Sequence, residues 1–325
     1  MSTRTILVTG ASGFVGRAVV ARILADGREV PRSALRATST LKPGGETVYV
    51  AELGAGADWG AAVRGVQTVI HCAARVHVMR ESAADPLAEF RRVNVEGTAA
   101  LARQAAAAGV ERFVFLSSIK VNGEETLPGR PYGATDTPAP ADAYGVSKLE
   151  AESAVLAIAN ETAMTASIIR PVLVYGPGVK GNFLTLMRLL SAGVPLPLGA
   201  VDNRRSLVAL DNLCDLVLTC ARHQAAANRT FLLSDGEDMS TTELLRRTAV
   251  ALGVAARLIP VRTSLLRAAM ALTGMGSFGR RLLGSLQVDI APTRDALGWR
   301  PPVAVDAALR AAAEDFLGGR RGGRR

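Results

Sequence analysis

The feature that most constrains the fold is a glycine-rich turn near the start of the chain. The segment VTGASGFVG sets Gly10, Gly13 and Gly16 between an apolar, strand-like run and a helical pattern. In such a unit the first glycine permits a tight turn, the second lets the backbone approach a pyrophosphate, and the third lets the helix pack on the strand. The free N–H groups at the start of the helix, around Phe14 and Val15, attract the phosphates. The turn therefore predicts a dinucleotide-binding unit.

The chain that follows alternates between strand-like and helical patterns. Strand-like runs read TILVTG, EVPRSAL, ETVYVAEL, TVIHCAA, RFVFLSS and ASIIRPVLVYG. This alternation is typical of an α/β fold of the Rossmann type, with a doubly wound parallel sheet covered on both faces. After Gly176, Pro-Gly turns separate short helices and one late strand, TFLLSD. We expect a nucleotide-binding domain over 1–175 and a smaller, partly interleaved substrate lobe over 176–318, with 205–235 packing back on the first domain.

Composition restricts the classes of function. Cys72, Cys214 and Cys220 have no CxxC spacing, so we expect free thiols, a reducing cytoplasmic compartment and no metal site. No signal peptide is visible, and no apolar run reaches the ~18 residues that a spanning helix needs. The late apolar segment LLRAAMALTGMG fits a helix of the substrate lobe better than a helix lying on a membrane surface.

Basic residues give the chain a net charge of +9, and four of these charges are the arginines of the C-terminal segment GGRRGGRR. This segment is glycine-rich, like-charged and without apolar residues, so we expect residues 319–325 to be disordered. Aromatic residues do not alternate with basic ones there, and no nucleic-acid partner is expected.

The second strand bears on which nicotinamide dinucleotide binds. In NAD-binding units an acidic residue near the end of this strand holds the ribose 2′-hydroxyl. Ala34 stands there in this chain, between Arg32 and Arg36. An arginine suits a 2′-phosphate, so Arg36 favours NADP(H), while NAD(H) stays possible and both arginines facing solvent is the alternative. Glu52, followed by Leu53, is expected to end the third strand and accept a hydrogen bond from the adenine amino group.

A tyrosine and a lysine supply a means of proton transfer. Tyr144 and Lys148 lie four residues apart in DAYGVSKLEAE and share one face of a helix. A free tyrosine has a pKa of about 10, and an ammonium group nearby lowers it. Lys148 is one of four lysines among 38 basic residues, which indicates a need for a compact ammonium group at this position. The strand FVFLSS ends in Ser117 and Ser118, and alternation lets only one of these face the nicotinamide.

Together these motifs resemble the extended short-chain dehydrogenase/reductase superfamily, and more closely its NAD-dependent epimerase/dehydratase family. The segments VIHCAA, VNVEGT, SSIKVNG, YGVSK, RPVLVYGPG and RRSLVALDN follow in the family's order, from Thr5 to about Pro302. The resemblance implies that Ser118, which opens S-x-x-V-x-G, is the catalytic serine. It also makes Tyr144 the acid/base and Lys148 the partner that binds the ribose.

The resemblance assigns further binding residues. Beside the cofactor it implies Ala73, Ala74, Asn94 and the backbone after Pro171. Beside the substrate it implies Ser118, Lys120, Asn182 and Arg205. A guanidinium fits paired phosphate oxygens, so Arg205 is expected to bind a diphosphate, with an ion pair to Asp211 as the alternative. Two segments depart from the pattern: Asn122 replaces a tyrosine in V-Y-G, and ARVHVMRES, with Arg75 and His77, has no close counterpart.

The end of the serine strand also separates possible reactions. Related 4,6-dehydratases resemble one another in a Thr-Asp-Glu where this chain has Ser118-Ile119-Lys120, so the carboxyl pair that eliminates water is missing. Hydride transfer at C4 of a UDP-sugar remains. We expect a 4-keto-sugar reductase of bacterial surface-polysaccharide synthesis, because SSIKVNGE, HCAARVHVM and AVDNRRSLVALDNLCD resemble that group. The alternatives are a UDP-glucose-type 4-epimerase with retained NAD and a non-catalytic NADPH-binding protein. The resemblance also implies a homodimer, through helices near 90–108 and 144–160.

Overall fold

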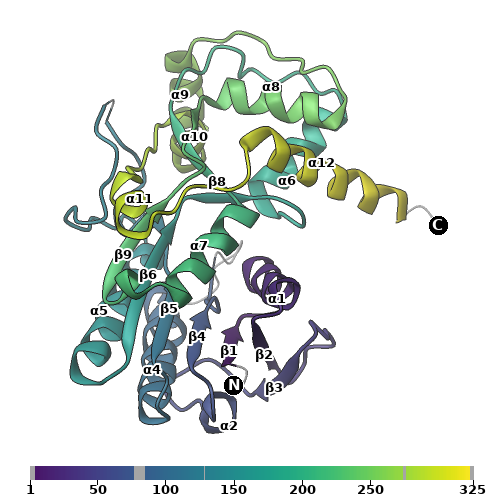
Figure 1. Ribbon diagram of the computed structural model, residues 1–325. Helices are drawn as coiled ribbons and strands as arrows, with labels where there is room; N and C mark the ends of the chain where they lie inside the picture. Colours follow the sequence, from purple (N-terminus) through teal and green to yellow (C-terminus); the bar gives the residue numbers. More distant parts are fainter. Residues whose placement is uncertain (1–3, 77–84, 128, 274–275, 323–325) are drawn as a thin grey trace.

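Figure 1 shows the computed structural model of the chain, which describes residues 4–76, 85–127, 129–273 and 276–322. Its larger part is a seven-stranded parallel sheet in the order β3-β2-β1-β4-β5-β6-β9. The strands are β1 (Arg4–Thr9), β2 (Glu29–Arg36), β3 (Glu46–Val50), β4 (Thr68–His71), β5 (Arg112–Leu116), β6 (Thr165–Pro171) and β9 (Arg229–Leu233). This confirms the predicted Rossmann-type fold. Strand order reverses between β1 and β4, where such sheets bind nucleotides.

Helices cover both faces of this sheet (Figure 1). One face is covered by α1 (Phe14–Asp26) and α7 (Leu210–Arg222), and the other by α2 (Gly60–Val63), α4 (Gly97–Ala107) and α5 (Ala143–Glu161). The remaining short helices of this domain are α3 (Pro86–Phe90), the π-helix η1 (Arg91–Glu96), and the 3₁₀-helices η2 (Ile119–Val121) and η3 (Gln224–Ala226). Alternation sends Ile6 and Val8 to the first face and Leu7 to the second. Because both faces are buried, the strands read as continuous apolar runs.

The smaller lobe is built on a second sheet in the order β10-β8-β7. Its strands are β7 (Leu173–Tyr175), β8 (Arg205–Ala209) and β10 (Asp238–Met239). Around it lie α6 (Gly181–Ser191), α8 (Thr241–Leu252), α9 (Thr263–Leu272), α10 (Gly276–Leu283) and α12 (Val305–Gly322), while α11 (Ala291–Leu297) packs against β9. Figure 1 shows α8, α9 and α10 at the end of the molecule opposite the N-terminus.

The run ASIIRPVLVYG forms two strands where one was predicted. β6 ends at Pro171 in the large sheet, and β7 begins at Leu173 and pairs with β8 in the small one. Proline has no N–H with which to extend a ladder, so the chain can leave the first sheet here. The connection between the two lobes therefore begins directly after Pro171, where the backbone is predicted to contact the cofactor.

The C-terminal segment also differs from its prediction. Helix α12 continues to Gly322, so residues 319–322 are helical, and the prediction of disorder is wrong for them. Arginine is a good helix former, which offsets the low propensity of the glycines. Residues 323–325 lie outside the described residues.

The turn at Gly10 gives a prediction about stability. Gly10 has φ +66°, and a Cβ there would lie 2.7 Å from the backbone nitrogen of Ala73; Gly27 has φ +64°, but a Cβ there would meet nothing within 4 Å. Alanine at either site costs roughly 1–2 kcal/mol for the left-handed conformation. We expect Gly10→Ala to lower the free energy of unfolding by a further ~1–3 kcal/mol through overpacking. Urea denaturation of both variants measures this, and equal losses would contradict it.

Candidate active site

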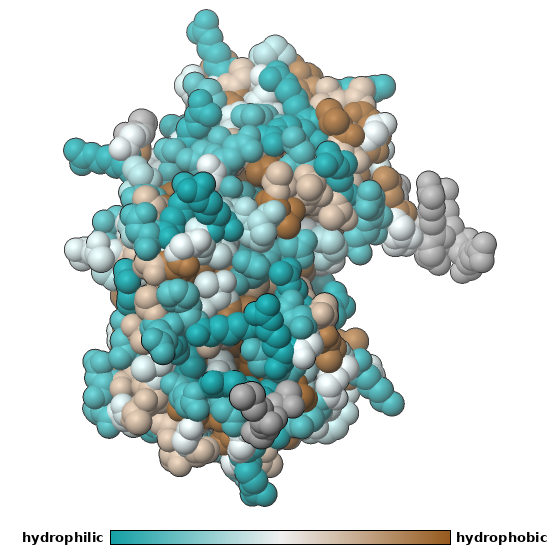
Figure 2. Space-filling model, in the orientation of Figure 1, coloured by the Kyte–Doolittle hydropathy of each residue, from teal (hydrophilic) through white to brown (hydrophobic). Residues whose placement is uncertain are grey.

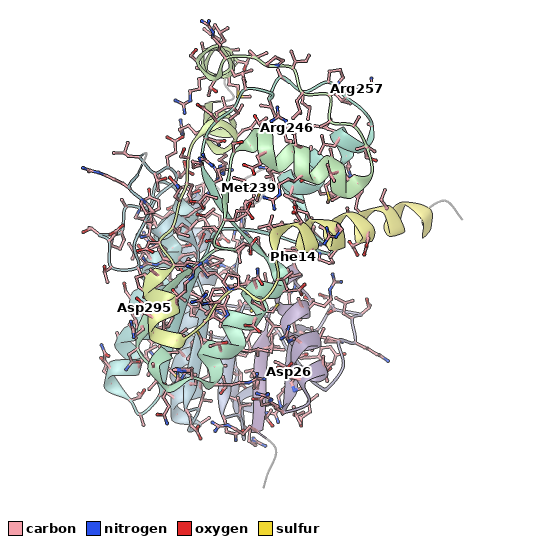
Figure 3. The ribbon with its side chains drawn as sticks, turned by 45° about the horizontal axis from the view of Figure 1, so that its top comes forward. Phe14, Asp26, Met239, Arg246, Arg257 and Asp295 are labelled. Carbon is pink, nitrogen blue, oxygen red and sulfur yellow. The ribbon has the colours of Figure 1, made fainter. Side chains whose placement is uncertain are left out.

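The turn between β1 and α1 presents backbone at glycine positions, where no side chain covers it. The N–H of Gly13 donates to the carbonyl of Gly10 at 2.8 Å, and Gly13 is an exposed N-cap with no side-chain hydrogen bond. A Cβ at Gly16 would collide with the Gly10 carbonyl oxygen. The half-buried Phe14 and Val15 begin the helix, and Figure 3 shows Phe14 at this end of α1, facing α12. The open N–H groups and the missing Cβ atoms fit the pyrophosphate of a dinucleotide.

The two arginines of the second strand have different surroundings. Arg32 donates to Glu46 at 2.7 Å and to the carbonyls of Ala62 and Arg64 at 3.0 and 2.7 Å. These bonds direct its guanidinium along the sheet edge. Arg36 ends β2 and is exposed. Of the two, Arg36 alone has the position expected for a contact with the adenosine ribose.

The segment after β3 differs from its prediction. The strand ends at Val50, and Glu52 lies beyond it, exposed and 3.1 Å from Arg92 in an ion pair. Leu53 is half-buried, and a Cβ at Gly97 would lie 3.2 Å from its carbonyl carbon. The prediction that Glu52 ends the third strand is therefore wrong, because the chain turns early to pass close to α4.

The segment that follows β4 is held from both sides. Thr9 Oγ1 accepts from the N–H of Ala73 at 3.3 Å and bonds Nδ1 of His71 at 2.6 Å, while Nε2 of His71 bonds Thr98 at 2.9 Å. Burial lowers the pKa of His71 to about 3, with a further contribution from Lys148, so the imidazole is neutral. His71, in β4, thus links β1 and α4 through the hydrogen bonds of its two ring nitrogens.

Asn94 binds the other end of this segment. Its side chain accepts from the N–H of Arg75 at 2.8 Å and donates to the Arg75 carbonyl at 3.1 Å and to Ser147 at 3.0 Å. Asn94 is buried within the π-helix η1, a form that occurs often at functional sites. The half-buried Ala73 and Ala74 are therefore fixed next to the glycine turn. The guanidinium of Arg75 lies 5.6 Å from the Phe90 ring centroid, and His77 lies outside the described residues.

The structure brings Ser118, Tyr144 and Lys148 to the carboxyl end of β5. The Ser118 hydroxyl caps η2 and hydrogen-bonds the phenol of Tyr144, which lies at the start of α5. Burial raises the pKa of Tyr144 to about 12; Asp142 adds to the rise and the Ser118 hydrogen bond opposes it. The pKa of the phenol is thus raised, whereas the sequence predicted that Lys148 would lower it.

Lys148 does not offset this rise because its ammonium group is directed elsewhere. Its Nζ donates to the Leu116 carbonyl at 2.7 Å and lies 3.9 Å from the Phe115 ring centroid. Burial lowers the pKa of Lys148 to about 7, opposed by Glu152 and Cys72. At neutral pH the phenol of Tyr144 is therefore neutral, and Lys148 is divided between its charged and its neutral form.

Ser117, the second serine of the strand, takes part in a buried network that the sequence did not reveal. Its hydroxyl donates to Glu152, whose carboxylate also accepts from Arg170 at 2.6 and 2.9 Å. Arg170 donates further to Asn122 at 3.0 Å, and Asn122 donates to the Gly133 carbonyl. This explains the departure at V-N-G, since the amide of Asn122 bonds the guanidinium. The signal in the sequence was Arg170 directly before Pro171 in a buried strand.

The predicted substrate residues Lys120, Arg205 and Asn182 have different surroundings. Lys120 forms an ion pair with Asp142 and lies 3.7 Å from Glu124. Arg205 begins β8 and donates to the Gly284 carbonyl at 3.0 Å; burial lowers its pKa, opposed by Glu125. Within the part of the chain that the structure describes, no ion pair joins Arg205 to Asp211. Asn182 is exposed in the first turn of α6.

Two features are missing from the part of the chain that the structure describes, a cluster of metal ligands and a membrane-spanning helix. Among them, no three His, Cys, Asp or Glu side chains lie close enough together to hold a metal ion. No described helix is both long and apolar enough to pass through a bilayer.

A parallel sheet that presents an open glycine turn and a Ser–Tyr–Lys group at one edge defines a dinucleotide-dependent oxidoreductase. The sequence profile of the NAD dependent epimerase/dehydratase family matches residues 6–233, and the chain belongs to this family, as predicted. It is 45% identical over 315 residues to a UDP-glucose 4-epimerase of Vibrio cholerae, covering 97% of this chain and 96% of that protein. It is 33% identical to a 3-beta-hydroxysteroid dehydrogenase of Mycolicibacterium neoaurum, covering 76% and 70%.

A solved structure agrees on the fold. A UDP-glucose 4-epimerase from Thermotoga maritima, crystallised with UDP-glucose, superposes with a TM-score of 0.77 at 20% identity, covering 97% of this chain and 99% of that one.

The buried network gives a second prediction. Arg170→Met leaves the carboxylate of Glu152 buried without its cation, and we expect a loss of about 3–5 kcal/mol in the free energy of unfolding. Replacing both residues by methionine removes the uncompensated charge and should recover much of this loss. Arg91→Met breaks an exposed ion pair with Glu150 and should change the free energy of unfolding little. Urea denaturation tests all three, and a double variant as unstable as the single one would contradict the role of the ion pair.

Lys148 gives a prediction about pH. The unfolded chain holds this proton up to a pKa of 10.5, whereas the folded chain releases it at about 7. Above a pH of 10.5 Lys148 is neutral in both states and does not affect stability. Between pH 10.5 and 7 the unfolded chain holds the proton that the folded chain releases, so the free energy of unfolding falls as the pH falls. We expect the free energy of unfolding of the cofactor-free protein to rise between pH 7 and 10 by on the order of 4 kcal/mol more in the wild type than in Lys148→Met. Parallel curves for the two proteins would show that Lys148 keeps its ordinary pKa.

Proposed function

We propose that the protein is an NAD-dependent 4-epimerase of a UDP-sugar. The observation that carries the proposal is the 45% identity to the Vibrio cholerae UDP-glucose 4-epimerase, which extends over 97% of the chain and so includes the substrate lobe. The likeness to the steroid dehydrogenase covers 76% of the chain. The higher identity and the fuller coverage of the epimerase, 45% over 97% of the chain against 33% over 76%, support a nucleotide sugar over a steroid.

The epimerase takes the place of the reductase predicted from sequence. Both reactions use hydride transfer at C4, and the same Ser118, Tyr144 and Lys148 serve either. Bound NAD would supply a hydride acceptor at C4 and return the hydride after the sugar has turned. A retained cofactor therefore distinguishes the epimerase, and the reductase becomes one outcome of the test below.

The residues of this chain perform the proton transfer. The phenol of Tyr144 exchanges a proton with the C4 oxygen, and Ser118 holds that oxygen by the same hydroxyl that now bonds the phenol. Burial and Asp142 keep the phenol protonated in the cofactor-free protein, which suits it to return a proton to a C4 alkoxide. When the C4 hydroxyl is oxidised, the Tyr144 oxygen would take up the hydroxyl proton as phenolate, a form that the positive nicotinamide ring of bound NAD would favour. The pKa of Lys148, about 7, lets its Nζ hold or release a proton at neutral pH.

On the substrate side, we assign the diphosphate to Arg205 and sugar or phosphate contacts to Lys120 and Asn182. Arg205 already bonds the Gly284 carbonyl, which orients its guanidinium at the start of β8. The NADP(H) preference predicted from sequence is not carried into the proposal. Arg32 is engaged by Glu46 and two carbonyls, so the preference would depend on Arg36 alone.

Two further expectations complete the proposal. All three cysteines are free thiols, which supports a reducing compartment such as the cytoplasm. Helices α4 and α5 pack beside each other on one face of the sheet, which supports a homodimer formed through them.

The purified chain tests this function directly. After desalting and denaturation, we expect about one NAD released per chain, and the intact protein should interconvert UDP-glucose and UDP-galactose, or their N-acetyl analogues, without added cofactor. A protein that releases no NAD and instead consumes NADPH with a UDP-4-keto sugar would replace the epimerase by the reductase.

Tyr144→Phe gives a prediction for this reaction. The phenol contributes a proton and little binding energy, so turnover should fall about 10²–10⁴-fold while NAD remains bound. Tyr132→Phe is the matched control, since its hydroxyl donates to the Glu125 carbonyl at 2.6 Å and lies outside the proposed site. Turnover near that of the control in Tyr144→Phe would remove the proton-transfer role.

A further inference from the structure

A long basic stretch forms one end of the smaller lobe. Residues 244–288, from α8 through α10, contain seven arginines and no aspartate or glutamate. Figure 1 shows these helices and the loop that joins α8 to α9 at the end of the molecule farthest from the N-terminus. In Figure 2 the same end carries projecting hydrophilic side chains between apolar patches. A stretch of this length without an acidic residue gives this end of the molecule an excess of positive charge.

Most of these arginines point away from acidic partners. Arg246, Arg257, Arg262, Arg267 and Arg280 are exposed, and Figure 3 shows Arg246 and Arg257 at this end. Among the described residues, acidic groups lie within ion-pair distance of Arg247 and Arg281 but not of these five. Arg267 donates to the Leu283 carbonyl at 3.3 Å, and the exposed guanidinium groups without an acidic neighbour are available to an anionic partner.

Helix α9 adds an apolar stripe to this charge. Leu265, Ala268, Ala269 and Leu272 follow at the spacing of one helix face, and all four are exposed. Leu265 is 61% and Leu272 90% accessible, while Leu266 on the opposite side is buried in the lobe. The helix is thus anchored by one face and presents a second apolar face to its surroundings.

We propose that this surface, the five exposed arginines together with the α9 stripe and here called the arginine face, binds an anionic membrane surface. An apolar helix face flanked by basic residues and free of acidic ones is the arrangement of an interfacial helix, which buries its apolar side at the headgroup boundary. The guanidinium groups pair with lipid phosphates. Nucleic acid would use the arginines but has no use for two exposed leucines, so charge and apolarity together favour lipid.

The arginine face adjoins the proposed substrate site. Gly284, directly after α10, accepts a hydrogen bond from Arg205 at 3.0 Å. Docking on a membrane would therefore set Arg205 and the proposed diphosphate site near the bilayer surface. Membrane binding through the arginine face would place an epimerase or a reductase alike at that surface.

Vesicle sedimentation of the full chain tests the inference. We expect binding to vesicles of phosphatidylcholine with 30% phosphatidylglycerol at low salt, little binding to pure phosphatidylcholine, and release at high salt. A basic residue near an anionic leaflet contributes about fivefold in the partition coefficient, so Arg257→Gln/Arg262→Gln should weaken binding about 25-fold. Leu272→Ser should weaken it about tenfold.

Matched variants separate this surface from general charge. Arg28→Gln/Arg64→Gln removes the same charge from exposed positions of the first domain, and Tyr49→Ser removes an exposed apolar group there. Neither should change binding, and replacing Arg320, Arg321, Arg324 and Arg325 by glutamine should leave most of it.

Three results would overturn the inference. One is no binding to the anionic vesicles at low salt. A second is an equal loss in the control pair or complete loss in the variant of the last four arginines. The third is binding of a DNA or RNA duplex, but not of vesicles, through Arg257 and Arg262.

Discussion

The buried ion pair between Arg170 and Glu152 is the interaction on which the site depends. Arg170 belongs to β6 and Glu152 to α5, and Ser117 at the end of β5 completes the contact. Each of these three residues is next to a proposed functional element: Pro171, the helix of Tyr144 and Lys148, and Ser118. A buried pair is costly to form and strongly destabilising to break, so its partners cannot shift independently. The geometry of proton transfer is thus fixed by charges that take no part in it.

The site also shows how burial can prepare groups for chemistry at the expense of stability. Burial moves the pKa of Tyr144 up to about 12 and that of Lys148 down to about 7, so in the cofactor-free protein the phenol stays neutral and the lysine is only partly charged at neutral pH. His71 is held neutral by the same cause. These polar groups stay inside because each has a hydrogen-bond partner, and they surround the point where the glycine turn opens. A phenol with a raised pKa beside an amine with a lowered pKa suits an enzyme that must pass a proton in both directions.

Local sequence predicted much of this structure, and the failures have physical causes. Gly10, Gly13 and Gly16 determined the turn and the sheet, because only glycine fits a positive φ or a close backbone approach. The alternation of Ser117 and Ser118 predicted that only one of them faces Tyr144, whereas the i, i+4 pair did not reveal that the Lys148 Nζ bonds the Leu116 carbonyl. The network of Arg170, Glu152 and Asn122 joins residues far apart in the chain, so the one local signal, an arginine in a buried strand, could not identify its partners. In the cofactor-free protein the Tyr144 pKa is raised and not lowered, because the Lys148 ammonium bonds the Leu116 carbonyl; the lowering predicted for lysine together with a bound nicotinamide ring stays a prediction. Arg32 similarly found partners that only the folded sheet edge provides.

The central claim is that hydride leaves C4 of a UDP-sugar and returns to the same carbon within one site. A UDP-hexose carrying deuterium at C4, incubated with the desalted protein and no added cofactor, tests it most directly. The account predicts a C4 epimer that retains its deuterium at C4, with no exchange into solvent, by NMR and mass spectrometry. Loss of the deuterium during epimerisation, or no epimer until reduced cofactor is added, would contradict it.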